Sequence, residues 1–155
     1  MANYSTIIMT IFYCATEPTD EPVGFTAHAS DGNIYYNTDD ILIFDSTATN
    51  IGGYYDTSSW QFLCPADGMY AFSFSALTTQ MERFYGSIMK ESTQLVSVFG
   101  ETAGTSGFNN GVTNFVITAC SKGERVWIRC LGDGHAIYDN SNRYTTFSGV
   151  LLQRF

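Results

Sequence analysis

Residues 60–77 constrain the fold of this chain more than any other stretch. After a corner at residues 65–68, the large side chains Tyr70, Phe72 and Phe74 alternate with smaller ones. A period of two is typical of a β-strand that has one face against a core. Proline fixes φ and glycine permits unusual φ values, so the corner predicts a tight reversal between two strands. The stretch therefore predicts a β-hairpin whose aromatic face lies in a hydrophobic core.

The remainder of the chain repeats this pattern. Strands are predicted at residues 23–29, 41–44, 84–90, 93–99, 112–120, 125–131 and 146–155, with a second hairpin turning at Lys122 and Gly123. No helical period appears. Many short strands at spacings of roughly 8–12 residues predict a sandwich or jelly roll. We expect one globular domain over residues 23–155, preceded at residues 1–22 by a short apolar leader or additional strand and a linker.

Charge excludes several classes of partner. The chain has 155 residues, a formal charge of −8 and only seven Lys and Arg. Nucleic acids and anionic membranes bind clustered cations, so neither is expected as a partner. No window of 18 apolar residues occurs, so membrane insertion is not expected either. Residues 1–16 contain no Lys or Arg, whereas a secretory signal begins with a basic segment.

Neither the cysteines nor the histidines form a recognisable reactive motif. In the predicted second hairpin, Cys120 and Cys130 would lie roughly 16 Å apart, beyond the ~7 Å limit between disulfide-bonded Cα atoms. Together with Cys64 they are interpreted as small buried hydrophobic residues. Cys14 stays open, including to inter-chain bonding. With two histidines and no zinc or thiol motif, no catalytic residue is predicted and the protein is not expected to be an enzyme.

An ordered set of motifs points to a known family. The motifs lie at residues 23–27, 43–45, 49–56, 62–72, 123–128 and 147–152. In this order they resemble the globular C1q-domain family, which is related in fold to tumour necrosis factor. The residues that mark the resemblance are Phe25, Phe44, Asn50, Tyr55, Phe62, Gly68, Tyr70, Phe72, Gly123, Phe147 and Gly149.

The resemblance implies a ten-stranded antiparallel all-β jelly-roll sandwich that assembles as a homotrimer. It also implies a secreted, extracellular protein with no required cofactor, similar to the bivalve-type members that lack a collagen region. Members of that type resemble recognition proteins of innate immunity, so microbial glycans or other microbial polymers are the expected ligands. The alternative is a structural or signalling trimer of the extracellular matrix, of biomineral or of receptors.

The resemblance also implies where ligands bind. Several relatives hold calcium near the apex of the trimer, where this chain has Arg83 and Ser92 with Glu82 and Glu91 adjacent. The two glutamates are the metal candidates, although Arg83 can replace a cation electrostatically. The expected contact surface is formed by the loops at residues 80–85, 90–93 and 133–143. Candidate ligand-binding residues are Trp60, Glu82, Arg83, Tyr85, Glu91, Asp133, His135, Tyr138, Arg143 and Tyr144. Trp60, Tyr138 and Tyr144 are expected to stack on sugar rings, although Trp60 can equally pack on a neighbouring subunit, and exposed tyrosines also occur in loops that bind nothing.

Overall fold

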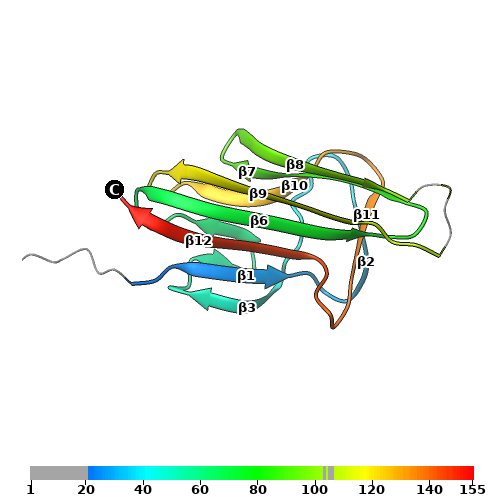
Figure 1. The fold of residues 1–155 in the computed structure, drawn as a ribbon, viewed down its shortest axis with the longest axis horizontal. Helices are drawn as coiled ribbons and strands as arrows, with labels where there is room; N and C mark the ends of the chain where they lie inside the picture. The colour runs from blue at the N-terminus through cyan, green and yellow to red at the C-terminus, as the bar shows by residue number, and fades with distance from the viewer. Residues whose placement is uncertain (1–20, 103, 105–106) are drawn as a thin grey trace, which may run out of the picture.

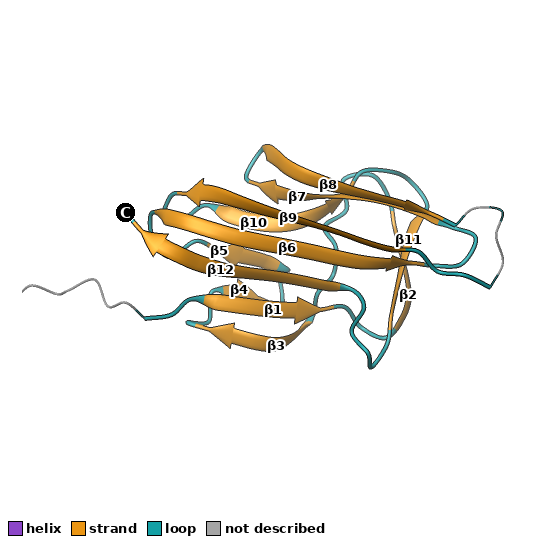
Figure 2. Cartoon of the chain, viewed as in Figure 1, coloured by secondary structure: helices purple, strands orange, loops and turns teal. Residues whose placement is uncertain are grey.

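The computed structural model describes residues 21–102, 104 and 107–155 as a sandwich of two antiparallel sheets (Figure 1). Strands and loops account for all of this described part, and no helix occurs in it (Figure 2). The seven-stranded sheet contains β1 (Gly24–His28), β2 (Gly32–Tyr36), β3 (Ser46–Ile51), β6 (Gly68–Thr78), β9 (Gly111–Cys120), β11 (His135–Asp139) and β12 (Thr146–Arg154). The five-stranded sheet contains β4 (Tyr55–Asp56), β5 (Gln61–Leu63), β7 (Arg83–Lys90), β8 (Thr93–Glu101) and β10 (Arg125–Cys130).

Strand β6 is the centre of the larger sheet. It pairs along its whole length with β9, and on its other side with β12 and, at its end, with β11. The inward side chains of Tyr70, Phe72 and Phe74 are fully buried, and those of Ser73 and Ser75 on the opposite face are half-buried. The alternation of large and small residues therefore predicted both the strand and its core face, and both are confirmed.

The core between the sheets is a cluster of aromatic rings. Phe25 stacks on Tyr55 and Phe62 at centroid distances of 4.7 and 4.9 Å, and it meets Phe147 edge-on at 4.9 Å. Phe72 lies 5.7 Å from Phe62. Offset and edge-to-face pairs of this kind add stability beyond the burial of apolar area. All five residues are marker positions of the family resemblance, so the markers are mostly core residues.

Two further markers are glycines that allow close packing. A Cβ on Gly149 would lie 2.6 Å from ring atoms of both Phe25 and Phe72. A Cβ on Gly68 would lie 2.5 Å from the carbonyl oxygen of Gln153. Gly68 is not among the residues with positive φ, so its role is the close approach of two strands and not the unusual φ expected from the sequence. Gly123, in contrast, has a φ of 92° and fits the left-handed turn that precedes β10.

Asn50, Tyr55 and Phe44 form a polar link at the edge of this core. The side-chain amide of Asn50 donates to the Tyr55 carbonyl at 2.9 Å and accepts from the Tyr55 N–H at 3.2 Å. The Tyr55 hydroxyl then donates to the carbonyl of Phe44 at 3.0 Å. Burial raises the pKa of Tyr55 well above its ordinary value, so this hydroxyl stays a donor at physiological pH. These three markers therefore hold the short strand β4 in place, which has little regular pairing of its own.

Both hairpins expected from the sequence are wrong. The reversal at residues 65–68 connects β5 in the smaller sheet to β6 in the larger one. The turn at Lys122 and Gly123 likewise connects β9 to β10 across the sandwich, since β10 pairs with β5 and β7. Each turn therefore joins the two layers instead of two neighbouring strands. Turn residues signal the reversal but not the sheet to which the next strand belongs.

The strand assignments are otherwise largely confirmed, with three differences. The described residues form twelve strands instead of ten, while the all-β sandwich itself is confirmed. β2, β3, β4 and β11 were not expected. Of these, β2 and β11 pair with each other from His135 opposite Tyr36 to Asp139 opposite Gly32. Residues 41–44 were expected as a strand but contribute only an isolated bridge between Ile41 and Arg129.

Cys64, Cys120 and Cys130 are buried free thiols, as expected, although the hairpin used to separate Cys120 from Cys130 does not exist. Burial raises the pKa of the Cys130 thiol, which keeps it protonated and unreactive. Cys14 and residues 1–20 of the expected leader and linker at residues 1–22 lie outside the described residues.

Candidate functional site

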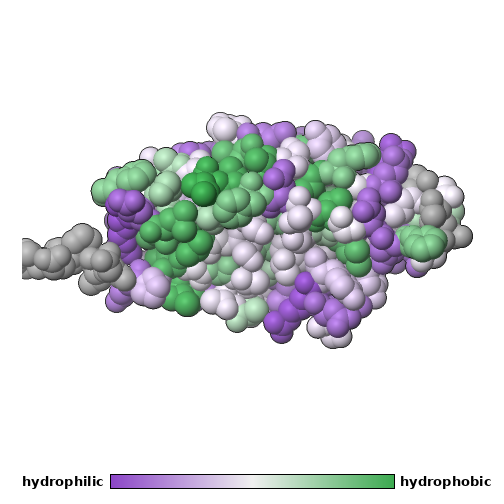
Figure 3. All heavy atoms as spheres, viewed as in Figure 1, coloured by the Kyte–Doolittle hydropathy of each residue, from purple (hydrophilic) through white to green (hydrophobic). Residues whose placement is uncertain are grey.

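The outward face of the larger sheet is apolar and carries few charges. Phe115 and Ile117 project outward from β9 with exposures of 57% and 54%, and Val150 and Leu152 project from β12. Neither β6 nor β9 contains a charged residue, in a chain whose net charge is −8. Hydrophobic side chains gather on this face in Figure 3. A contiguous exposed apolar surface of this kind marks an interaction site.

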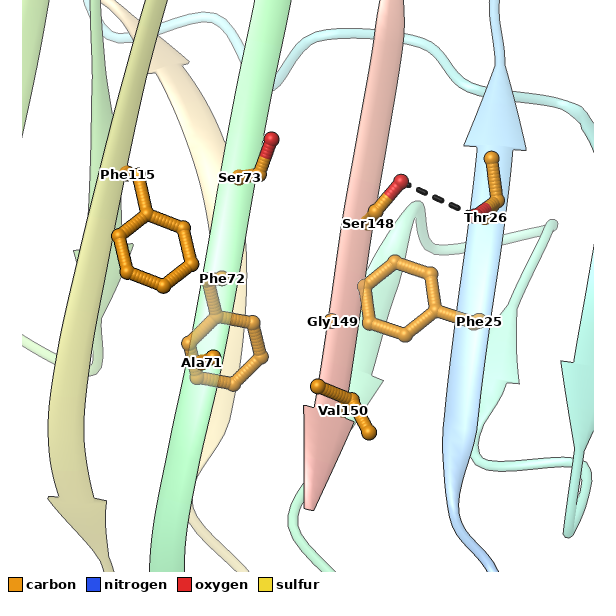
Figure 4. A pocket seen from close by; sticks show the side chains of 9 residues that line it. All are labelled: Phe25, Thr26, Ala71, Phe72, Ser73, Phe115, Ser148, Gly149 and Val150. Atoms are coloured by element: carbon orange, nitrogen blue, oxygen red, sulfur yellow. Dashed lines mark hydrogen bonds between the residues drawn. The ribbon is translucent and has the colours of Figure 1, made fainter. Parts of the chain in front are cut away.

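A shallow hollow of about 230 Å³ lies in the middle of this face. Phe115 stands at one side of it, and Ser148, Val150 and Thr26 line the other (Figure 4). The Ser148 hydroxyl donates to the Thr26 hydroxyl at 3.0 Å. The hollow thus offers apolar contacts with internally bonded hydroxyls, which suits the flat surface of another protein better than a polar small molecule.

Two further hollows share the side chain of Tyr35, which is 62% exposed on β2. The first, which we call the amide hollow, encloses about 550 Å³ and is lined by Asn33, Tyr35, Thr79, Gln80, Met81, Asn109 and Tyr138. The second, the acidic hollow, encloses about 430 Å³ and is lined by Tyr35, Tyr36, Asp39, Asp40, Ile41, Ile43 and Trp60. Both volumes fall in the range of small-molecule sites.

The amide hollow combines two tyrosines with neutral hydrogen-bonding groups. Thr79 and Gln80 follow the buried part of β6, and Asn33 and Tyr138 face each other across the β2–β11 pair. The Thr79 hydroxyl donates to Asn33 Oδ1 at 3.4 Å, which leaves Asn33 Nδ2 without a partner among the described residues. The Tyr138 hydroxyl accepts a hydrogen bond from Asn140 Nδ2 at 3.2 Å. Amide donors beside aromatic faces suit a ligand that has both hydroxyl groups and apolar faces.

The acidic hollow is held in place by the end of β10. The Asp39 N–H donates to the Cys130 carbonyl at 2.9 Å, and the Cys130 N–H donates to the Asp40 carbonyl at 2.8 Å. Below the hollow, the Tyr36 hydroxyl accepts the N–H of Ile43 at 3.1 Å. Burial raises the pKa of Tyr36 to about 12, so this hydroxyl is not ionised. These bonds therefore hold the backbone of Asp39 and Asp40 and the side chain of Tyr36 in place.

Backbone strain accompanies both hollows. Asp39, Trp60 and Met81 have φ values of 70°, 59° and 62°, in the left-handed region that costs a large L-residue free energy. Trp60 is held there by its N–H, which donates to the Asp56 carbonyl at 2.8 Å. Hydroxyl donors from Ser58 and Ser59, with the Ser58 N–H, lower the pKa of Asp56 to about 2. Strained residues of this kind cluster at binding sites more than elsewhere.

The structure places the predicted site residues at both ends of the sandwich. Glu82 precedes β7 and Glu91 follows it, so about 30 Å of extended chain separates them. Glu91 lies near the described termini, where its Oε1 accepts the Arg125 N–H at 2.6 Å. The loop at residues 90–93 is therefore not part of the distal end, by which we mean the end opposite the described termini (Figure 1). Within one subunit the two glutamates cannot hold the same metal ion.

His135 and Asp133 have structural roles. The imidazole is only 7% exposed, its Nδ1 accepts the Tyr85 N–H at 3.1 Å, and its ring lies near Phe84. Most of the imidazole surface is therefore covered by the protein itself. Asp133 is exposed and accepts the Thr38 N–H at 2.8 Å, which lowers the pKa of its carboxyl. It positions the loop that leads into Asp39.

The remaining candidates do not form one group. Tyr85 lies on the outer side of the smaller sheet, where its ring centroid is 6.1 Å from that of Phe99. Tyr144 lines a separate hollow beside β6 and β9. Arg83 and Arg143 are exposed and line neither the amide nor the acidic hollow. Only Tyr138 and Trp60 of the predicted residues lie in the two hollows, one in each.

Sequence reasoning missed Tyr35, the residue that joins the hollows, together with Asn33 and the aspartates. The run Ile34-Tyr35-Tyr36 has the composition of a strand, and this was the available signal. It is short, and the partner strand β11 lies about a hundred residues later, so no local pattern linked the two.

No group of three or more His, Cys, Asp or Glu side chains in the described ranges is arranged to hold a metal ion. The same ranges contain no helix with the length and hydrophobicity to cross a membrane.

This chain matches a family model and several curated proteins. The family model described as C1q domain matches residues 24–152. Complement C1q tumor necrosis factor-related protein 3 of Mus musculus is 32% identical over 119 residues, which are 76% of this chain and 47% of the relative. Caprin-2 of Danio rerio is 35% identical over 115 residues, which are 74% of this chain and 12% of the relative. The chain thus spans about half, or less, of the length of these curated relatives.

Solved structures share the fold at lower identity. The globular domain of zebrafish complement 1qA protein covers 86% of this chain and 99% of its own, with a TM-score of 0.68 at 16% identity. Eiger TNF from S. frugiperda has a TM-score of 0.68 at 10% identity, covering 87% of this chain and 95% of its own. Murine APRIL has a TM-score of 0.65 at 10% identity, covering 85% of this chain and 100% of its own. With the family model matching most of its length, the chain belongs to the C1q domain family.

Proposed function

We propose that this chain is an extracellular, non-catalytic recognition protein that assembles as a homotrimer and binds microbial glycans at Tyr35. Its family supports a C1q-type ligand-binding role. The observation that carries the glycan proposal is the pair of hollows on either side of Tyr35, one of which is lined by neutral amides and tyrosines. Sugars combine hydroxyl groups with apolar ring faces, and this pair of hollows offers complements to both.

The apolar face of the larger sheet supports self-assembly. Three chains would together carry a large negative charge, so subunits can approach closely only through surfaces with few charges. The outward residues of β9 and β12 around Phe115 and Val150 provide such a surface. The residues that line the hollow at Phe115 line neither the amide hollow nor the acidic hollow. Assembly through this face therefore leaves Tyr35 available to ligand.

Trimeric presentation matters because a shallow saccharide site binds weakly. Three sites that reach the same polymer convert a weak contact into an overall affinity higher by about 10²–10⁴. The repetitive surfaces of microbes present such polymers. Extracellular location is part of this proposal, since the ligand lies outside the host cell.

A glycan array probed with the fluorescently labelled trimer tests the proposal. We expect binding to a restricted set of saccharides, unchanged by calcium or a chelator because no cofactor is required. Tyr138→Ala is expected to weaken binding about tenfold, because it removes one aromatic face from the amide hollow. Tyr85→Ala is the matched control, since Tyr85 is an exposed tyrosine that lines neither hollow.

A blank array from a folded trimer would contradict glycan recognition and favour the structural or signalling alternative. Equal losses in the Tyr138→Ala and Tyr85→Ala variants would contradict the location of the site. Binding that disappears with the chelator would contradict the expectation that calcium is not needed.

A further inference from the structure

The two hollows at Tyr35 differ in charge. Among the described residues, no charged side chain lines the amide hollow, whereas Asp39 and Asp40 line the acidic hollow on the other side of the same tyrosine. A saccharide chain that lies across Tyr35 would therefore meet neutral donors on one side and carboxylates on the other. This asymmetry distinguishes sugars by their charge. Most sugars carry no positive charge, so only the few that do can pair with the carboxylates.

Asp40 is the carboxylate that remains available to a ligand. Asp39 Oδ1 lies 3.3 Å from the guanidinium of Arg129, which offsets its negative charge. Asp40 Oδ2 accepts the N–H of Asn37 at 2.7 Å, and this contact orients the carboxylate. Asp40 Oδ1 has no hydrogen-bond partner among the described residues. The hollow thus holds one oriented carboxylate that has an unused acceptor and no cationic partner in the described part of the chain.

Aromatic rings border the same carboxylate. Tyr35 is largely exposed and Trp60 is half-buried, and the two come from segments far apart in the chain. Indole and phenol faces attract organic cations as well as the apolar faces of sugar rings. A carboxylate alone would select any cation, and an aromatic wall alone would select any ring. Together they select a ring that carries a cation.

We infer that the acidic hollow recognises a protonated amino sugar, with the ring against Tyr35 and Trp60 and the ammonium group on Asp40. The inference rests on the proposed glycan-binding function and assigns a sugar class to one part of that site. The ammonium group donates to Asp40 Oδ1 in a charge-assisted hydrogen bond, which is stronger than a bond between neutral groups. N-acetylation of the sugar removes the charge and with it this contact.

Calorimetric titration of the intact trimer with two oligosaccharides of equal length tests the inference. The probes are a glucosamine oligomer with free amines and the same oligomer fully N-acetylated. We expect the free-amine oligomer to bind about tenfold more tightly at low salt, and this preference to shrink as salt is added. Asp40→Asn is expected to abolish the preference by lowering the affinity for the free-amine oligomer.

Asp31→Asn is the control for non-specific attraction, because it removes the same charge at an exposed position that lines neither hollow. Equal affinity for the two oligomers would overturn the amino-sugar inference and leave glycan binding standing. An equal effect of Asp31→Asn and Asp40→Asn would also overturn it, since net charge would then explain the preference. If neither oligomer bound and the glycan array were also blank, the proposed function itself would be overturned.

Discussion

The Phe115→Asp variant is expected to sediment as a monomer of about 17.2 kDa, and the wild-type chain at about three times that mass. Phe115 projects from the centre of the apolar face on β9 with a 57% exposed side chain. In an assembly through this face, the substitution would bury an unpaired carboxylate in each subunit. Such a charge costs several kcal/mol, and about 4 kcal/mol is already a thousandfold loss of affinity.

Sedimentation equilibrium at micromolar concentration measures this effect. Leu63→Asp is the matched control, because Leu63 is an exposed apolar residue on a strand of the smaller sheet. We expect the control to stay trimeric. A trimeric Phe115→Asp variant would show that subunits associate elsewhere, and a monomeric wild type would show that they do not associate at all.

The largest effect on folding stability is expected from Phe147→Ala. Phe147 is completely buried and its ring lies within 6.2 Å of the rings of Phe25, Phe44, Tyr55 and Phe72. Removing a buried phenyl group leaves a cavity and costs about 3–5 kcal/mol. That loss is a large fraction of the total free energy of unfolding of about 5–15 kcal/mol that is usual for a domain.

Urea unfolding should be measured in the Phe115→Asp background, so that subunit dissociation does not contribute to the transition. Phe99→Ala, at a side chain that is 57% exposed, provides the same truncation outside the core and should cost less than about 1 kcal/mol. If Phe147→Ala lowered the free energy of unfolding by as little as Phe99→Ala, the assignment of the ring cluster around Phe147 as the core would be contradicted.

The sequence predicted the architecture well where one strand carries its own signal. The alternation in β6 and the apolar runs of β7, β8 and β12 show which residues face inward, because strand periodicity is a local property. The two misassigned hairpins depend on a non-local property, namely which sheet the next strand joins. Residues 41–44 bury the side chains of Leu42 and Phe44 without forming a ladder. Their backbone groups bond individually, as Leu42 N–H does to the Ile128 carbonyl at 2.9 Å.

The candidate site was less predictable than the core for the same reason. Trp60 and Tyr138 were identified as residues that could stack on a sugar, but Tyr35, which connects them, was not. Tyr35 becomes central only because β2 pairs with β11, which brings Asn33 opposite Tyr138. Glu82 and Glu91 are near in sequence but lie at opposite ends of an extended strand, so one subunit does not bring them together. In a β-sandwich, closeness in sequence is a poor guide to a shared site.

The fluorescence of Trp60 provides the most direct test of the Tyr35 site. The chain has two tryptophans, Trp60 and Trp127, so Trp127→Phe leaves only the indole that lines the acidic hollow. In this variant, titration with a saccharide selected on the array is expected to protect Trp60 from acrylamide quenching, in a saturable manner and by about twofold at saturation. Adding Tyr35→Ala should remove both the protection and the binding. A saccharide that binds the trimer with full affinity while the quenching of Trp60 stays unchanged would contradict the site proposed here.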